Sequence, residues 1–247
     1  ILHPMAEEGK EAAGSMGDDT PVAVLSSHFR PVSHYFRQNF SQVTNPPIDS
    51  LRENKVMSLK TRFGNLGNIL DFDNLTEENI YVLDSPILTN SQFKKFKKFF
   101  SKKIKVIDCT FDIQNSLKDR IEAIREEVET AVREGSTCIV LSDKDFSSQK
   151  ASIPSILTVG AVHSHLVKHG LRGYCSLNVE CSDAMDTHSF AILIGVGATT
   201  VNPYLAIDSI YQRFEKKLFG KSDFETCVSK FKKKIEAGII KINYKIG

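Results

Sequence analysis

KVIDCTFDIQNSLKDRIEAIREEVETAVREGSTCIVLS, residues 105–142, decides the fold class of this chain. KVID at 105–108 and TCIVLS at 137–142 have the short β-branched runs of strands, and the stretch at 117–135 has apolar residues at helical spacing. Two neighbouring strands joined by a helix of this length run parallel, because antiparallel neighbours need only a tight turn. The stretch is therefore a strand–helix unit followed by the next strand of one sheet.

The same alternation continues toward the C-terminus. Further helices are predicted at 153–170, at 187–197 and from 204 onward, with strands at 174–180 and 199–203. Gly135, Gly170 and Gly197 each stand where a helix must stop before the next strand. Four consecutive strand–helix units predict an α/β protein with parallel strands and helical crossovers. The pattern alone leaves open whether the sheet is open or closed into a barrel.

The N-terminal part lacks this rhythm. We divide one domain of 1–247 into an irregular N-terminal portion at 1–103, a βα-repeat portion at 104–216 and a lead-in toward a further domain at 217–247. Within the first portion, VAVLS at 22–26 predicts a strand and 34–43 a helix. The chain lacks an initiator methionine, so we expect it to be a piece of a longer polypeptide.

Composition narrows the classes of protein. A chain of 247 residues with 41% hydrophobic residues can bury a substantial core. The formal net charge of +2 gives no overall attraction to nucleic acid or to anionic lipid, and no apolar run reaches the length of a membrane span. The five cysteines are scattered without a CxxC pair, which indicates reduced thiols in a reducing compartment and disfavours a zinc or iron–sulfur site built on such pairs.

Polar residues follow each predicted strand. They are Asp108, Asp143, Glu180 and Asn202. Ligands of parallel α/β sheets bind at the carboxyl ends of the strands, so these residues could form the rim of an active site. The same residue types are also the preferred turn and N-cap residues. Both interpretations stay open at this point, and the second needs no ligand.

The sequence offers little for a bound cofactor or metal. A phosphate cradle requires glycines after a strand and before a helix, whereas the GxG formed by Gly195 and Gly197 precedes a strand. His163 and His165 are two residues apart on a helix and so point about 200° from each other. His188 has no paired carboxylate or cysteine at a defined spacing, which favours a packed histidine. We expect no cofactor and no metal site.

A lysine-rich segment, FKKFKKFFSKKIKV at 93–106, admits two interpretations. It could be a basic amphipathic helix that binds a membrane or an acidic partner. Alternatively, it is a helix that buries its phenylalanines and leaves its lysines in solvent. We favour the second because the segment leads straight into a core strand. The phenylalanines expected to be buried are Phe93, Phe96, Phe99 and Phe100.

Five longer motifs then occur in a fixed order: MAEEGKEAAGSMGDDTPVAVLS, FSQVTNPPID, LDSPILTN, IPSILTVGAVHSHLV and FAILIGVGATTVNPYLA. In this order they resemble the central domain of the large subunit of glutamate synthase, from about residue 4 to about residue 215. The departures are mild: Ser164 breaks a usual histidine run, Ser189 replaces a second histidine, and Val196 replaces a usual tyrosine.

The resemblance implies a function. In that family, a glutamine amidotransferase domain and a synthase domain with FMN and a 3Fe-4S cluster flank the central domain, and the whole enzyme is an oxidoreductase. The central domain is a partial, rudimentary relative of the FMN-binding (β/α)8 barrel, without a cofactor or catalytic residues of its own. The resemblance thus implies a connecting domain, inactive alone, whose partners are the two flanking domains of the same chain. It also implies a cytoplasmic or plastid-type compartment.

The resemblance further implies an ammonia channel near the N-terminus. It would be lined by Met16, Gly17, Thr44 and Asn45. Met16 is a flexible apolar side chain, Gly17 permits a close backbone turn, and Thr44 and Asn45 can exchange hydrogen bonds with a small neutral solute.

Two other functions stay as alternatives. One is a free-standing βα-barrel enzyme that binds FMN or a phosphorylated substrate at the four strand-end residues. The other is a basic interaction module that uses the lysines of 93–105.

Overall fold

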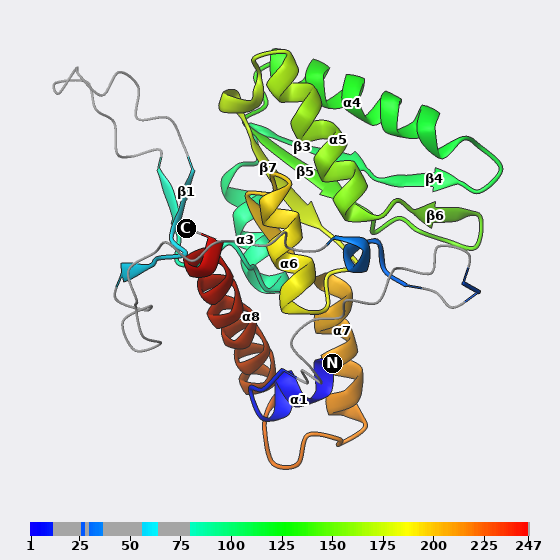
Figure 1. Cartoon of the computed structure of the whole chain (residues 1–247). Helices are drawn as coiled ribbons and strands as arrows, with labels where there is room; N and C mark the ends of the chain where they lie inside the picture. Colours follow the sequence, from blue (N-terminus) through cyan, green and yellow to red (C-terminus); the bar gives the residue numbers. More distant parts are fainter. Residues whose placement is uncertain (12–25, 28–29, 37–55, 64–79, 247) are drawn as a thin grey trace, which may run out of the picture.

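A four-stranded parallel sheet forms the centre of the molecule (Figure 1). The computed structural model describes residues 1–11, 26–27, 30–36, 56–63 and 80–246. The strands are β3 (Ile104–Asp108), β5 (Cys138–Ser142), β7 (Ser176–Glu180) and β8 (Thr200–Asn202), in the order β3-β5-β7-β8. Every neighbouring pair is parallel. Within the described residues the sheet is open, with β3 at one edge.

The helices that follow these strands are α4 (Leu117–Arg133), α5 (Ser155–Lys168), α6 (Thr187–Gly195) and α7 (Tyr204–Glu215). The predicted succession of strand–helix units is thereby confirmed. Gly135, Gly170 and Gly197 have φ values of 98°, 69° and 119°, in the left-handed region that favours glycine after a helix. These three glycines stop the helices where the sequence predicts.

Alternating side chains give the sheet two buried faces. On one face, Ile139 and Leu141 of β5 belong to the main core, together with side chains of α4, α5, α6 and α7. On the other face, Cys138 and Val140 pack with Phe93 of α3 (Asn90–Phe99). Because β5 is buried on both faces, it is apolar throughout its length except for Ser142 at its end, as expected for a central parallel strand.

The position of α3 follows from the handedness of crossovers. The segment at 86–88 pairs beside β8: Leu88 N–H donates to Val201 O at 2.9 Å, and Val201 N–H donates to Pro86 O at 2.8 Å. From this edge, α3 returns the chain to β3 at the opposite edge. The later crossovers step across the sheet in the reverse direction. A right-handed crossover that runs toward β3 places its helix on one face of the sheet, and right-handed crossovers that run toward β8 place their helices on the other face. α3 therefore covers the face that α4 to α7 leave free.

The lysine-rich segment is confirmed as a packed amphipathic helix, with one correction. Thr89 begins α3 with a capping box in which its hydroxyl accepts from Gln92 N–H. Phe93 and Phe96 are buried and Phe100 is partly buried, but Phe99 is 50% exposed and lies beside Tyr81, with ring centroids 4.7 Å apart. The expectation that Phe99 is buried is therefore wrong, because α3 ends there and its last turn faces only a two-stranded sheet. That sheet pairs β1 (Thr61–Phe63) with β2 (Tyr81–Leu83).

Several elements lie outside the predicted pattern. β4 (Thr110–Asp112) and β6 (Lys150–Ser152) form an antiparallel pair, and residues 172–174 form a single 3-10 turn. The helix predicted at 34–43 does not begin there: Val32–Tyr35 is a 3-10 helix and Phe36 is extended, while 37–43 lies outside the described residues. Residues 22–25 of the predicted strand also lie outside them.

Two helices from opposite ends of the sequence complete the core. α1 (Leu2–Glu7) packs against α8 (Phe224–Ile246), and the Lys230 ammonium donates to Glu7 O at 2.6 Å. α8 contributes Phe231 and Ile235 to the main core. The segment at 217–247, interpreted as a lead-in to a further domain, thus takes part in this core, whereas the division of the chain into portions stays a prediction. In the part of the chain that the structure describes, no helix combines the length and the apolar character needed to cross a membrane.

Candidate functional site at the carboxyl edge of the sheet

Strand register aligns three of the four predicted strand-end residues. Asp108 pairs with Ser142, Ser142 with Glu180, and Glu180 with Asn202. Side chains in register point to the same face of a sheet, here the face covered by α3. Asp143 follows one residue later and points the opposite way. The structure therefore brings all four residues to one edge but separates Asp143 from the others.

Glu180 is a buried carboxylate with three partners. Its Oε2 accepts a hydrogen bond from Ser142 Oγ at 2.8 Å. Its Oε1 lies 3.3 Å from Lys97 Nζ and 3.5 Å from Lys144 Nζ. Only 6% of the Glu180 side chain is exposed, so both oxygens need this compensation. These contacts connect α3, which carries Lys97, and the loop after β5, which carries Lys144, to Glu180 of β7.

Asn202 and Asp108 complete local backbone structure. Asn202 Nδ2 donates to Leu88 O at 2.9 Å and to Asn90 Oδ1 at 3.0 Å, which fastens the start of α3 to β8. Asp108 Oδ1 accepts from Thr110 N–H at 2.9 Å and from Thr110 Oγ1 at 2.8 Å. Both contacts favour the interpretation of these residues as turn and cap residues.

Asp143 is a buried carboxylate whose hydrogen bonds are incomplete among the described residues. Its Oδ2 accepts from Ser182 N–H at 3.0 Å and from Ser182 Oγ at 2.5 Å, whereas its Oδ1 has no hydrogen-bond partner among the described residues. Burial raises the pKa of Asp143 despite these bonds. Burial and the nearby charge of Asp143 also raise the pKa of the Tyr204 phenol. Asp143 is therefore the strand-end group with the most perturbed chemistry.

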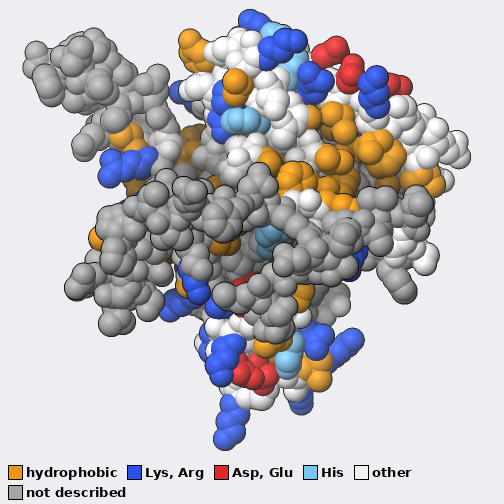
Figure 2. Space-filling model, in the orientation of Figure 1, with side chains coloured by type: hydrophobic (Ala, Val, Ile, Leu, Met, Phe, Trp, Pro, Cys, Tyr) orange, Lys and Arg blue, Asp and Glu red, His pale blue; other side chains and the backbone are white. Residues whose placement is uncertain are grey.

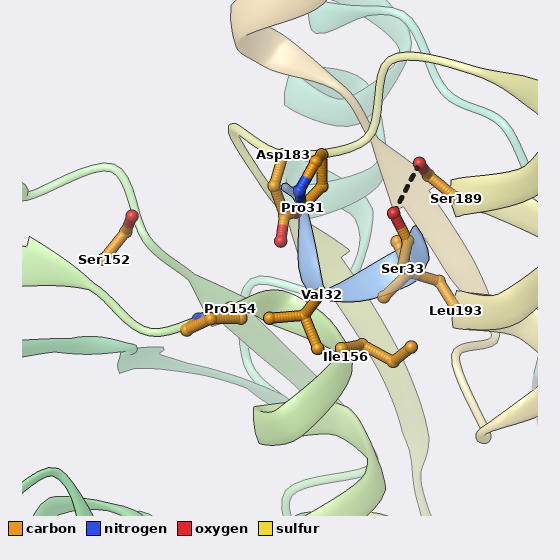
Figure 3. Close-up of a pocket in the computed structure, with 9 residues that line it drawn as sticks. All are labelled: Pro31, Val32, Ser33, Ser152, Pro154, Ile156, Asp183, Ser189 and Leu193. Atoms are coloured by element: carbon orange, nitrogen blue, oxygen red, sulfur yellow. Dashed lines mark hydrogen bonds between the residues drawn. The ribbon is translucent and has the colours of Figure 1, made fainter. Parts of the chain in front are cut away.

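A small cavity adjoins this edge (Figure 3). It has a volume of about 180 Å³ and lies where the segment at 31–33 crosses the start of α5 and α6. Ser33 and Ser189 approach each other across it, with their hydroxyl oxygens 3.4 Å apart. Its lining residues are Pro31, Val32, Ser33, Ser152, Pro154, Ile156, Asp183, Ser189 and Leu193. The wall combines apolar side chains with serine hydroxyls and the Asp183 carboxylate, and a cavity with such polar groups can hold water.

The histidines and the GxG lie as the sequence predicts. His188 Nε2 donates to Ser33 O at 2.9 Å, and so ties the segment at 30–36 to α6 as a packed histidine. Gly195 is the last residue of α6, and Gly197 N–H donates to Ile194 O at 3.0 Å. The GxG is thus confirmed as a helix stop before β8. The predicted channel residues Met16, Gly17, Thr44 and Asn45 lie outside the described residues.

One polar cluster was missed by the sequence reasoning. His163 and His165 do point apart, toward Arg172 and Glu129 respectively. His165, however, also has His169 one helical turn away, and both rings lie beside Glu129 of α4. The H-x3-H spacing at 165 and 169 was the available signal, because residues four apart share one helix face.

Together these features define a class: a parallel α/β domain whose strand-end polar residues brace the sheet internally. Comparison with known proteins specifies the family. Residues 1–247 match the family described as "Glutamate synthase central domain", and the chain belongs to this family.

Relatives agree with this membership. The chain is 52% identical to the glutamate synthase [NADPH] large chain of Azospirillum brasilense and 39% identical to that of Bacillus subtilis. It is 37% identical to the chloroplastic ferredoxin-dependent glutamate synthase of Spinacia oleracea. Each alignment covers 100% of this chain but only 16% of the relative. The chain therefore spans about a sixth of the length of these relatives.

Proposed function

We propose that this chain is a non-catalytic connecting domain of a glutamate synthase. It joins a glutamine amidotransferase domain to a synthase domain that carries FMN and a 3Fe-4S cluster, and it helps to form the ammonia passage between them. The family match over residues 1–247 is the observation that carries the proposal. The matched relatives, named as NADPH- and ferredoxin-dependent glutamate synthases, support it.

The strand-end contacts support a structural role. Glu180 is held by two lysines and a serine, and Asn202 is held by the backbone of the segment before α3. A general acid or base must reach a substrate proton, whereas Glu180 and Asn202 already have protein partners, and Asp143, which keeps one oxygen unpartnered among the described residues, is buried. This favours a connecting domain over the free-standing βα-barrel enzyme.

The same edge fits a flavin phosphate poorly. A phosphate needs free backbone N–H groups at a helix start, but the residue after β5 is the acidic Asp143, which would repel an anion. Gly197 N–H, the other candidate, already donates within its helix stop. We therefore assign FMN and the iron–sulfur cluster to the neighbouring domain of the longer polypeptide.

Surface charge and the cysteines bear on the partners and compartment. In Figure 2, Lys and Arg side chains are spread over several parts of the visible described surface and form no single patch. The formal net charge of +2 supports the flanking domains of the same chain as partners, rather than nucleic acid or a membrane. All five cysteines are buried free thiols, which suits a cytoplasmic or plastid-type reducing compartment.

Met16, Gly17, Thr44 and Asn45 are the residues that we propose line the passage. The family match over the whole chain, which includes the motifs that contain these residues, is what supports this proposal. Ammonia would cross such a passage as a neutral solute, which needs a narrow path lined by apolar side chains and a few groups for hydrogen bonding.

The test is to obstruct the passage in the full-length polypeptide. Thr44→Phe should leave glutamine hydrolysis and the synthesis of glutamate from added ammonia intact, but it should raise the ratio of glutamine hydrolysed to glutamate formed. Thr137→Phe, at an exposed position beside β5, is the matched control. A substitution at the exposed Thr137 changes stability within about 0.5 kcal/mol, and intact glutamine hydrolysis in Thr44→Phe would show that this variant is folded. An unchanged ratio in Thr44→Phe would remove Thr44 from the passage.

A further inference from the structure

A two-histidine, one-carboxylate cluster lies between α4 and α5, which run side by side on one face of the sheet (Figure 1). Glu129 comes from α4, and His165 and His169 come from α5. Glu129 Oε2 lies 2.6 Å from His165 Nε2 and 4.0 Å from His169 Nδ1. One possible ligand atom from each residue lies within 4.8 Å of the others.

These separations suit one shared metal ion. Zinc lies about 2.0–2.2 Å from histidine nitrogen and carboxylate oxygen, so two ligand atoms of one tetrahedral ion are about 3.4 Å apart. The 2.6 Å Glu129–His165 pair has to open by roughly 0.8 Å and the 4.0 Å Glu129–His169 pair to close by roughly 0.6 Å, shifts that small side-chain rotations can provide. The i, i+4 spacing on α5 sets both imidazoles on one face, one turn apart, with ring centroids 4.2 Å apart.

The carboxylate of Glu129 is held in place by Arg133. Arg133 holds Oε1 of Glu129, with Nη2 at 2.7 Å and Nε at 2.8 Å, and so leaves Oε2 directed to the histidines. A neighbouring group that orients a ligand carboxylate is a regular feature of metal sites. The positive charge of Arg133 also opposes a cation, which sets a limit on the affinity.

The His165 side chain is mostly buried but makes few polar contacts among the described residues. Its side chain is 11% exposed, and its Nδ1 has no hydrogen-bond partner among the described residues. The bond to Glu129 is the polar contact found for the ring, with Nε2–H as the donor because a carboxylate only accepts. An ion can replace that proton without breaking a second bond of the ring. His169, by contrast, must give up a 2.8 Å contact of Nδ1 with His165 O.

We propose that Glu129, His165 and His169 bind a divalent transition-metal ion of the zinc class at the α4–α5 surface. Two nitrogens and one oxygen come from the protein and water completes the coordination. This ligand set suits Zn²⁺, Ni²⁺ or Cu²⁺ rather than Mg²⁺ or Ca²⁺, which prefer all-oxygen sites. The ion would link α4 to α5 on the surface of the domain. The inference is independent of the ammonia passage and replaces the expectation that the chain has no metal site.

The test is Zn²⁺ titration by calorimetry of the full-length polypeptide, with wild type compared with single variants. His169→Ala removes a ligand whose side chain is 35% exposed, so the fold should be preserved. We expect the variant to lose one Zn²⁺ site or to bind it at least about tenfold more weakly. Glu129→Gln should have a similar effect. His34→Ala removes a histidine that is 40% exposed and lies outside the cluster, and it should match wild type.

Three results would overturn the proposal. They are absence of Zn²⁺ binding by wild type, equal Zn²⁺ stoichiometry and affinity in wild type and His169→Ala, and an equal loss in His34→Ala. Wild-type thermal unfolding provides a second measurement, because an ion that binds only the folded state raises the unfolding temperature. That rise should disappear in His169→Ala and persist in His34→Ala.

Discussion

Replacing Gly197 by alanine tests directly whether this glycine is needed to end α6 before β8. Gly197 has a φ of 119°, where residues with a Cβ are strained. An added Cβ would lie 2.4 Å from Nδ1, 2.6 Å from Cγ and 2.9 Å from Cβ of His163. Because the Cβ of His163 is itself too close, rotation of the imidazole ring alone cannot relieve the overlap. The side chain or its helix must shift.

The expected cost has two parts. Holding a residue other than glycine in this backbone region costs about 1–3 kcal/mol. Displacing His163 breaks its 3.1 Å hydrogen bond from Arg172 Nε, which contributes about 1 kcal/mol. Together these give a loss of roughly 2–4 kcal/mol in the free energy of unfolding. For a chain of this size, that lowers the melting temperature by roughly 5–15 °C.

Gly195→Ala supplies a matched control within the same GxG. Gly195 is the last residue of α6, and nothing lies within 4 Å of an added Cβ. Alanine is favoured over glycine in a helix by up to about 1 kcal/mol, so this variant should match wild type or exceed it. Urea unfolding, followed by circular dichroism, measures both changes. Losses of similar size in the two variants would contradict the helix-stop interpretation, as would a loss below about 1 kcal/mol in Gly197→Ala.

Two further predictions concern titration and thiol chemistry. Burial and Arg172 lower the pKa of His163 from 6.5, so below about pH 6.5 the unfolded chain binds more protons than the folded one, and the free energy of unfolding should fall as the pH falls. Urea unfolding between about pH 7.5 and 5.5 should show a shallower decline in His163→Gln, and an unchanged slope would refute this role. The five cysteines are buried, and burial raises the pKa of Cys138 to about 12. They should resist a thiol reagent in the folded protein and all react in urea, whereas a disulfide between Cys175 and Cys181 would refute both this prediction and the extended strand between them.

Local signals account for the parts of the fold that the sequence predicts. The β-branched run of β5 and the glycine after each helix act within a few residues, so they can be read without knowledge of the partner elements. The common edge of Asp108, Glu180 and Asn202 follows as well, because parallel strands end at one side of a sheet. The hydrogen-bond and ion-pair partners of the strand-end residues, in contrast, cannot be predicted from local sequence. Glu180 pairs with Lys97, 83 positions earlier, and no local pattern indicates that contact.

Long-range pairing explains what was not predicted. The segment at 86–88 is too short for a visible period of two, and its partner, Val201, lies in the last strand. β4 and β6 have only three residues each, so their alternation of side chains is also too short to recognise in the sequence. The separation of Asp143 from the other strand-end residues, however, was available from the alternation of side chains along β5. The Glu129–His165 contact required the packing of two helices, and the sequence showed only the histidine spacing.

The contact between α1 and α8 has a consequence for how the chain acquires its structure during synthesis. α1 has six residues, too few for a stable isolated helix, and its Met5 and Ala6 are fully buried in the finished protein. Because synthesis runs from the N-terminus to the C-terminus, Glu7 leaves the ribosome long before its partner Lys230, which lies 223 residues later. Until then the N-terminal turn has no surface to pack on. The sheet and its helices α4 to α6 can form while the chain is still growing, but α1 takes its place in the core only after α8 has been made.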